Sequence, residues 1–292
     1  MPFGRRAAGL MLVSVGAMFA GAMSTGVVSP AMASAEPIRL AGHRAVYELS
    51  LAESSASRAV ESARGRIVLD FGGDACKGYT MQTRQVTQLE SGESGSRTSD
   101  LRNTTFESAD GRNFRFKTAT LLNEAPSQSV DGTAEIGADA MKVRLKEPKR
   151  DQFQATNPVL FPSLHMRRLI EAARAGEKTL SVKVFDGSDD GRKVYDTLAV
   201  IGRKTDAPQK GERDKPLREG GMAAMPRWPV TLSYYTPGDG ERTPIYVLTF
   251  DLYDNGVSGA LRLDYGSFAI VGDLTRLDLT QGAPEGGKAC SP

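Results

Sequence analysis

Residues 245–265 read IYVLTFDLY-DNG-VSGALRLDY, and the two outer runs are rich in the β-branched and aromatic residues that favour strands. Between them, Asp254, Asn255 and Gly256 form a sequence typical of a tight turn. Residues 245–250 are apolar on both faces, so we expect them to line an enclosed space or to lie under a helix. The stretch therefore predicts an antiparallel hairpin within a curved sheet.

The same period of two recurs along the chain. Apolar residues at alternate positions predict further strands around Tyr47 to Leu51, Ile67 and Leu69, Met141 to Leu145, Val182 and Val184, Leu198 and Val200, and residues 267–280. Gly72 and Gly73 predict the turn after the second of these. Open antiparallel sheets with many strands bury their faces and edges poorly, so we expect the sheet to curl. The fold class is mainly β, with one curved antiparallel sheet.

One segment has a helical period. Within residues 157–176, four apolar residues at i, i+3, i+4 and i+7 form a single stripe: Met166, Leu169, Ile170 and Ala173. Pro162 suits the first turn, Ser163 is a candidate cap and Gly176 fits the end, which predicts a helix over 162–175. Such a helix either covers the concave side of the sheet as a lid or packs across it to complete the core.

The N-terminus is typical of an export signal. Arg5 and Arg6 precede an apolar stretch over residues 7–22, and Ala33 and Ala35 flank Ser34 before Glu36. We expect cleavage after Ala35, with Ala33 as the alternative, export of a soluble product and one domain over residues 36–292. Without the two signal arginines, the chain has 35 Lys and Arg against 35 Asp and Glu, which argues against nucleic-acid binding. No segment has the 18 or more apolar residues of a membrane-spanning helix.

The chain has two cysteines, Cys76 and Cys290. In an exported protein two thiols favour pairing, although two free thiols remain an alternative. Closing a loop of this length would stabilise the fold by roughly 5 kcal/mol on the chain-entropy model. Neither cysteine has a second thiol near it in the sequence, so we expect a structural bond.

Catalytic and metal-binding signals are weak. The two histidines, His43 and His165, are interpreted as a partly exposed strand-end residue and a helix residue hydrogen-bonded to backbone, with a shared metal site as the alternative. Residues 186–191 (DGSDDG) resemble the first half of a calcium loop, but the twelfth position is Thr197, and a polar turn is preferred. We therefore expect no catalytic residue, no metal and no cofactor.

Two further parts of the sequence lead to predictions. Residues 206–226 hold few large apolar residues, Leu217 among them, which predicts a mobile loop that buries little. Aromatic and apolar residues downstream and on the helix could line a lipophilic groove, with ordinary core as the alternative. The candidate groove residues are Trp228, Tyr234, Tyr246, Phe250, Leu164 and Met166.

The chain resembles a known family in six features. These are the export signal, the cysteine pair and the segments HRAVYELSL (43–51), NPVLFPSLHMRRLIEAA (157–173), FDGSDDGRKVYDT (185–197) and YVLTFDLYDNGVSGALRLDYGSFAI (246–270). Together they are similar to the EipB family of cell envelope integrity proteins, which are periplasmic proteins of Gram-negative bacteria. The resemblance implies a β-spiral, an incomplete barrel with a helix in its concave side, like the LolA and LolB lipoprotein carriers in outline. It also implies a disulfide between Cys76 and Cys290 and no enzyme activity.

Three functional hypotheses follow. A scaffold would bind envelope proteins, a periplasmic tetratricopeptide-repeat protein among them, through exposed strand edges or a surface patch. A carrier would hold a lipid, a lipoprotein acyl chain or a hydrophobic peptide in a dry groove beneath the helix. An envelope hydrolase would need His43 or His165 in a buried cluster with carboxylates.

Overall fold

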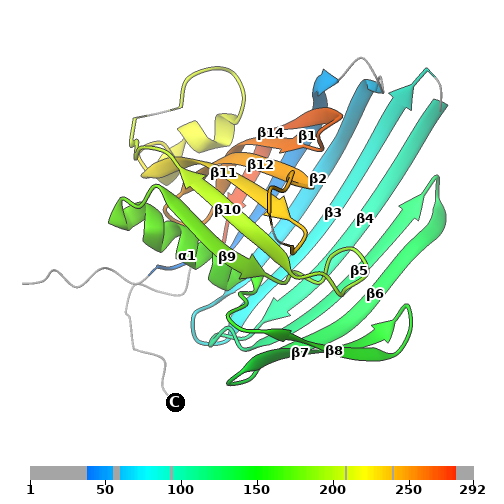
Figure 1. Cartoon of the computed structure of the whole chain (residues 1–292). Helices are drawn as coiled ribbons and strands as arrows, with labels where there is room; N and C mark the ends of the chain where they lie inside the picture. Colours follow the sequence, from blue (N-terminus) through cyan, green and yellow to red (C-terminus); the bar gives the residue numbers. More distant parts are fainter. Residues whose placement is uncertain (1–37, 55–59, 93–94, 208, 239, 281–292) are drawn as a thin grey trace, which may run out of the picture. The chain divides into compact units, whose positions relative to one another are not determined.

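The computed structural model describes residues 38–54, 60–92, 95–207, 209–238 and 240–280; the signal segment and Cys290 lie outside them. The described residues form one antiparallel sheet of fourteen strands, one α-helix and two 3-10 helices (Figure 1). The strands are β1 (His43–Ser54), β2 (Val60–Asp74), β3 (Gly78–Ser91), β4 (Gly95–Glu107), β5 (Asn113–Leu122), β6 (Ala125–Ile136), β7 (Ala140–Glu147), β8 (Asp151–Thr156), β9 (Thr179–Val184), β10 (Tyr195–Ile201), β11 (Arg227–Tyr235), β12 (Tyr246–Tyr253), β13 (Ser258–Asp264) and β14 (Phe268–Leu279). The helices are α1 (Pro162–Ala175), η2 (Lys215–Arg218) and η3 (Gly220–Met222).

The strand order shows how the chain builds the sheet. It runs β8 to β1 and then β14 to β9, so neighbouring strands in the sheet are consecutive in sequence except where β1 pairs with β14. In Figure 1 the blue β1 lies beside the orange-red β14. The edges are therefore β8 and β9, and the chain between these two strands contains α1.

Contacts between distant strands show that the sheet curls. Phe116 on β5 and Phe185, which follows β9, have ring centroids 5.4 Å apart, although their strands are ten positions apart in the order. A flat sheet would separate these strands by about 48 Å. Leu160, between β8 and α1, also forms a parallel bridge with Val184. The predicted curved antiparallel sheet is confirmed as an incomplete barrel.

The period of two places one face of the strands in the interior. On β1, His43, Ala45, Tyr47 and Leu49 are buried in alternation with more exposed residues. The same pattern buries Met141, Val143 and Leu145 of β7, as predicted. Below, the interior means the space faced by this set of residues.

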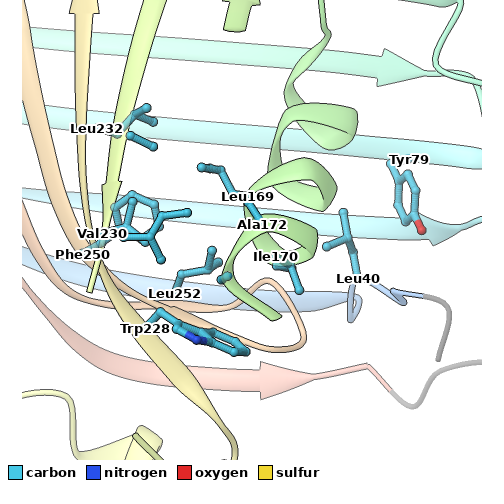
Figure 2. Close-up of a cluster of buried hydrophobic side chains, with 13 residues drawn as sticks. Leu40, Tyr79, Leu169, Ile170, Ala172, Trp228, Val230, Leu232, Phe250 and Leu252 are labelled. Atoms are coloured by element: carbon cyan, nitrogen blue, oxygen red, sulfur yellow. The ribbon is translucent and has the colours of Figure 1, made fainter. Parts of the chain in front are cut away.

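Helix α1 begins at Pro162 and ends before Gly176, which has φ 77° and donates its N–H to Ala173. Leu169, Ile170 and Ala173 of the predicted stripe are buried. Figure 2 shows Leu169 and Ile170 packing among side chains of β11, β12 and the segment before β1. The predicted cap is wrong, because Ser163 is a helical residue and its side chain caps no backbone group.

The predicted turn at Gly72 and Gly73 is also wrong, because β2 continues to Asp74 and the turn follows it. Gly73 has φ 109°, and a Cβ there would lie 2.1 Å from the backbone oxygen of Gly78. Glycine at this position therefore permits close strand pairing beside the turn. By contrast, the 254–256 hairpin turn has the predicted position, with Gly256 at φ 85°.

Residues 206–226 differ from the prediction of a segment that buries little. Leu217 of η2 and Met222 of η3 are only 1% and 3% exposed and belong to a core cluster with β1 and β14. The Asp214 carboxylate accepts hydrogen bonds from the backbone N–H groups of Ala260 and Leu274, at 2.7 and 2.6 Å. A few buried contacts thus fix a largely polar segment against the sheet.

Candidate functional site: an internal apolar cavity

The interior contains a cavity of about 290 Å³ bounded by β1 to β4, α1 and the β12–β13 hairpin. Its lining is mostly apolar, and Leu69, Met81 and Leu248 are representative. Among the described residues, the hydroxyl-bearing residues of the lining are Tyr47, Thr105, Ser163 and Ser258. Concave, mainly apolar sites with a few polar groups are the usual form of small-ligand sites.

The N-terminus of α1 is held over this cavity by Glu107, the last residue of β4. The Glu107 carboxylate accepts hydrogen bonds from the N–H groups of Ser163 at 2.7 Å and Leu164 at 2.9 Å. Only 2% of Glu107 is exposed, and this burial raises the pKa of its carboxyl group while the two N–H donors oppose the shift. A carboxylate at a helix N-terminus also interacts favourably with the helix dipole. Glu107 therefore caps α1 from another element.

The other end of α1 is held by an ion pair. Arg174, in the last turn, donates two hydrogen bonds to Asp254, at 2.7 and 2.8 Å. Asp254 begins the turn of the β12–β13 hairpin, and the next two residues, Asn255 and Gly256, line the cavity. Both ends of the helix are thus fastened to elements that surround the cavity.

The two histidines are buried and uncharged near neutral pH. His43 lines the cavity, only 5% of it is exposed, and its Nδ1 lies 2.8 Å from the oxygen of Ala41. The interpretation of His43 as partly exposed is wrong. Burial lowers the pKa of His43, and it lowers the pKa of His165 to about 4.

His165 differs from its interpretation in its hydrogen bonding. In the described ranges its Nε2 is buried without a hydrogen-bond partner, and no hydrogen bond joins its ring to the backbone. No group of three or more His, Cys, Asp and Glu residues is arranged to hold a metal within the same ranges.

The six predicted groove residues are divided between four environments. Met166 lines the cavity, whereas Trp228 and Phe250 are 4% and 3% exposed in the core against α1. Tyr234 and Tyr246 stack on each other with ring centroids 4.7 Å apart. Leu164 packs near Gly111, where a Cβ would lie 3.0 Å from its Cδ2. The structure therefore brings only Met166 of this set into the cavity lining.

The calcium-like segment forms a polar turn between β9 and β10. The Asp186 carboxylate accepts from Ser188 N at 2.9 Å, and the Asp190 carboxylate accepts from Arg192 N at 3.0 Å. Asp189 binds Lys193 at 2.5 Å. These acidic groups satisfy local hydrogen bonds and one ion pair.

Glu107 and Met81 are site residues that no sequence motif indicates. Both lie at interior positions of β4 and β3 when the period of two is extended along those strands. A glutamate facing the interior is the available signal, because buried carboxylates need partners. The partner itself, the first turn of α1, is 56 residues away in the sequence.

These features define a class: an incomplete antiparallel barrel with a helix fastened over an apolar interior. The chain belongs to the EipB-like family, whose model matches residues 34–281. It is 35% identical over 250 residues to the cell envelope integrity protein EipB of Brucella abortus (strain 2308), covering 85% of this chain and 88% of that protein. The crystal structure of a β-barrel-like protein of a domain-of-unknown-function family (DUF1849) from Brucella abortus has a TM-score of 0.78, with 35% identity, and covers 84% of this chain and all of that one.

The family supports a role in cell envelope integrity and an envelope location. A search of the described residues for a helix long and apolar enough to cross a membrane finds none.

Proposed function

We propose that this chain is a non-enzymatic periplasmic protein that supports envelope integrity by holding an acyl chain of a lipid or lipoprotein in its internal cavity. The observation that carries this proposal is the apolar cavity of about 290 Å³ beneath α1. Its volume is close to the lower end of the range for ligand sites, about 300 Å³. Each methylene group transferred from water into such a site contributes about 0.8 kcal/mol.

The periplasmic part of the proposal is supported by residues 1–35, whose pattern is typical of an export signal. The non-enzymatic part is supported by His165. Burial is what shifts the pKa of His165, with no carboxylate contributing, so this residue lacks the partner that a hydrolytic general base would need.

The test is native mass spectrometry of the protein purified from an envelope fraction, followed by lipid extraction. We expect a co-purifying acyl-containing ligand in the parent. Met81→Trp should fill the cavity and abolish the ligand, because Met81 lines it. Gln82→Trp is the matched control, since Gln82 is exposed on the opposite face of β3.

Both variants should keep the thermal midpoint of the parent within a few degrees. A folded parent that carries no lipid in repeated preparations, or a Met81→Trp variant that retains the same ligand, would contradict this proposal.

A second candidate function, a scaffold for other envelope proteins, is favoured by β8. This strand ends the sheet order, and residues of Asp151–Thr156 are mostly exposed. Exposed edges can pair with a strand of another protein. Gln154→Pro, which removes an N–H from the edge, should abolish capture of such a partner, for which a tetratricopeptide-repeat protein is the first candidate. Capture that is equal for the parent and the variant would contradict this candidate.

A further inference from the structure

Four tyrosines form a row on the interior face of the sheet, here called the tyrosine belt: Tyr195, Tyr234, Tyr246 and Tyr265. Ring centroids of successive members are 5.9, 4.7 and 6.2 Å apart. Their elements are β10, β11, β12 and the segment after β13, so the belt crosses this part of the sheet. Burial raises the pKa of Tyr246 well above its ordinary value, which keeps its hydroxyl protonated.

Both ends of the belt contact the opposite wall of the interior. At one end, the hydroxyl of Tyr265 interacts with the side chain of Gln85 on β3. At the other end, the hydroxyl of Tyr195 donates to the Asp189 carboxylate at 3.2 Å. The backbone oxygen of Asp189 in turn accepts a hydrogen bond from the side chain of Gln128 on β6.

Gln85 and Gln128 are joined across the sheet by a single row of paired residues. Gln85 pairs with Leu101, Leu101 with Thr120, and Thr120 with Gln128. The belt, Asp189 and this row therefore form a closed ring around the interior. The residues of the belt and of the row are uncharged at neutral pH, and Asp189, which links them, is paired with Lys193.

The ring lies next to the apolar cavity. Leu248 and Leu263 line the cavity, and each is two residues from a belt member, Tyr246 and Tyr265 respectively. Residues two apart on a strand face the same side. The belt is therefore directly adjacent to the cavity wall, whereas α1 borders the cavity through Pro162, Ser163 and Met166.

Two unsatisfied polar atoms lie between the ring and the cavity. Asn103 of β4 is two residues from Leu101 of the ring and two residues from Thr105 of the cavity lining, and it pairs with Thr118 of β5. Asn103 Oδ1 and Thr118 Oγ1 are buried, and neither has a hydrogen-bond partner in the described part of the chain. Only 7% of Thr118 is exposed.

The chemistry of these atoms restricts what can satisfy them. An amide oxygen is only an acceptor, so Asn103 Oδ1 needs a donor, and a hydroxyl can serve both Asn103 and Thr118. A phosphate or carboxylate offers acceptors and a negative charge. Lys193, the cation next to the ring, is already paired with Asp189, and neither a lysine nor an arginine belongs to the belt, to the row or to the Asn103–Thr118 pair. Burying such an anion without a cation is costly.

Given the ligand-binding function proposed above, we infer that the ligand is an amphiphile with an uncharged, hydroxyl-bearing headgroup. Its acyl chain occupies the apolar cavity. Its headgroup lies inside the ring and donates a hydrogen bond to Asn103 while exchanging one with Thr118.

The test compares two probes with the same tail, dodecyl glucoside and dodecyl phosphate, by isothermal titration calorimetry below their micelle-forming concentrations. We expect the glucoside to bind about tenfold more tightly, the effect of satisfying buried hydrogen-bonding groups. In the double variant Asn103→Leu/Thr118→Val this preference should fall below about twofold. Thr104→Val, on the exposed face of β4, is the matched control and should keep the full preference.

Circular dichroism and the thermal midpoint establish that each variant is folded. Equal affinity for the two probes, or tighter binding of the phosphate, would overturn the headgroup assignment while leaving the ligand-binding function intact. A preference that survives in the double variant would also overturn it, since solvent would then be what satisfies the two atoms. Absence of binding by either probe to folded parent would overturn both proposals.

Discussion

The two ends of the interior are built from different interactions. At the α1 end, a buried carboxylate and an ion pair fix a helix whose apolar stripe completes the core. At the belt end, the ring consists mostly of neutral tyrosine, glutamine, threonine and leucine side chains, with Asp189 as its one carboxylate, and Tyr265 is 39% exposed. Bonds to charged groups are individually stronger than neutral ones. The α1 end is therefore expected to be the stable end and the belt end the adaptable one.

The largest expected effect concerns the disulfide predicted at the α1 end. Cys76 lies in the turn between β2 and β3, close in sequence to Tyr79 of the core beneath α1, and Cys290 lies outside the described residues. Cys76→Ser should lower the free energy of unfolding by about 5 kcal/mol, because the unfolded chain regains the entropy of an open loop. Urea denaturation with and without reductant measures this difference.

Reductant should destabilise the parent to the level of Cys76→Ser and leave the variant unchanged. A parent whose unfolding midpoint does not respond to reductant would show that its thiols are not paired.

Removing the cap of α1 should have the next largest effect. Glu107→Ala leaves two N–H groups, those of Ser163 and Leu164, without their acceptor, at a cost of about 2–4 kcal/mol for two unsatisfied buried donors. Hydrogen exchange should become faster in α1 and remain unchanged in β5. Glu107→Gln keeps one acceptor oxygen and should lose about half as much stability. Unchanged exchange in the first turn of α1 would mean that Glu107 does not fasten the helix.

The contributions of two acidic residues of β4 to the stability of the fold should change with pH in opposite directions. Burial raises the pKa of Glu107, so its contribution to stability is complete below its ordinary pKa of 4.5 and is lost as the pH rises through the raised value. The Arg102 and Arg84 guanidinium groups lower the pKa of Asp100 from 3.8 to about 2. The Asp100 contribution is therefore complete above pH 3.8 and is lost as the pH falls towards 2.

Urea denaturation between pH 2 and 7 tests these signs. The stability difference between the parent and Glu107→Gln should decrease as the pH rises, whereas the difference between the parent and Asp100→Asn should increase. If both stability differences changed with pH in the same direction, the opposite pKa shifts assigned to Glu107 on the interior face and Asp100 on the outer face of β4 would be wrong.

Local patterns in the sequence predicted strands, turns and the helix better than they predicted the contacts between these elements. The helix, the 254–256 turn and the strands β1, β2, β7, β9, β10 and β12 to β14 follow from residue alternation, glycine and proline positions, which act over a few residues. The strands β3 to β6, β8 and β11 were not predicted. The fastening of α1 by Glu107 depends on the curl of the sheet, which joins residues far apart in the chain. Leu217 shows the same limit, because one apolar residue in a polar segment gives no periodic signal although it is almost completely buried.

The candidate groove was only partly predictable for a related reason. Alternation places Phe250 and Tyr246 on the same face of β12, but it cannot tell a residue that packs in the core from one that faces the interior ring. That distinction depends on where α1 ends along β11 and β12. Once α1 is placed, Phe250 lies beneath it, whereas Tyr246 stacks between Tyr234 and Tyr265 in the belt.

The smallest expected effect is at the belt end, where Tyr265→Phe removes only the hydroxyl that interacts with Gln85. Because this group is neutral and partly exposed, the loss should be about 0.5–1 kcal/mol, well below that for Glu107→Ala. Tyr47→Phe is a buried counterpart, since the Tyr47 hydroxyl donates to Ser258 O at 2.8 Å beside the cavity. It leaves that carbonyl without its donor and should cost more. If Tyr265→Phe proved as destabilising as Glu107→Ala, the ring would be a rigid part of the fold, and the belt end would not be the adaptable end of the interior.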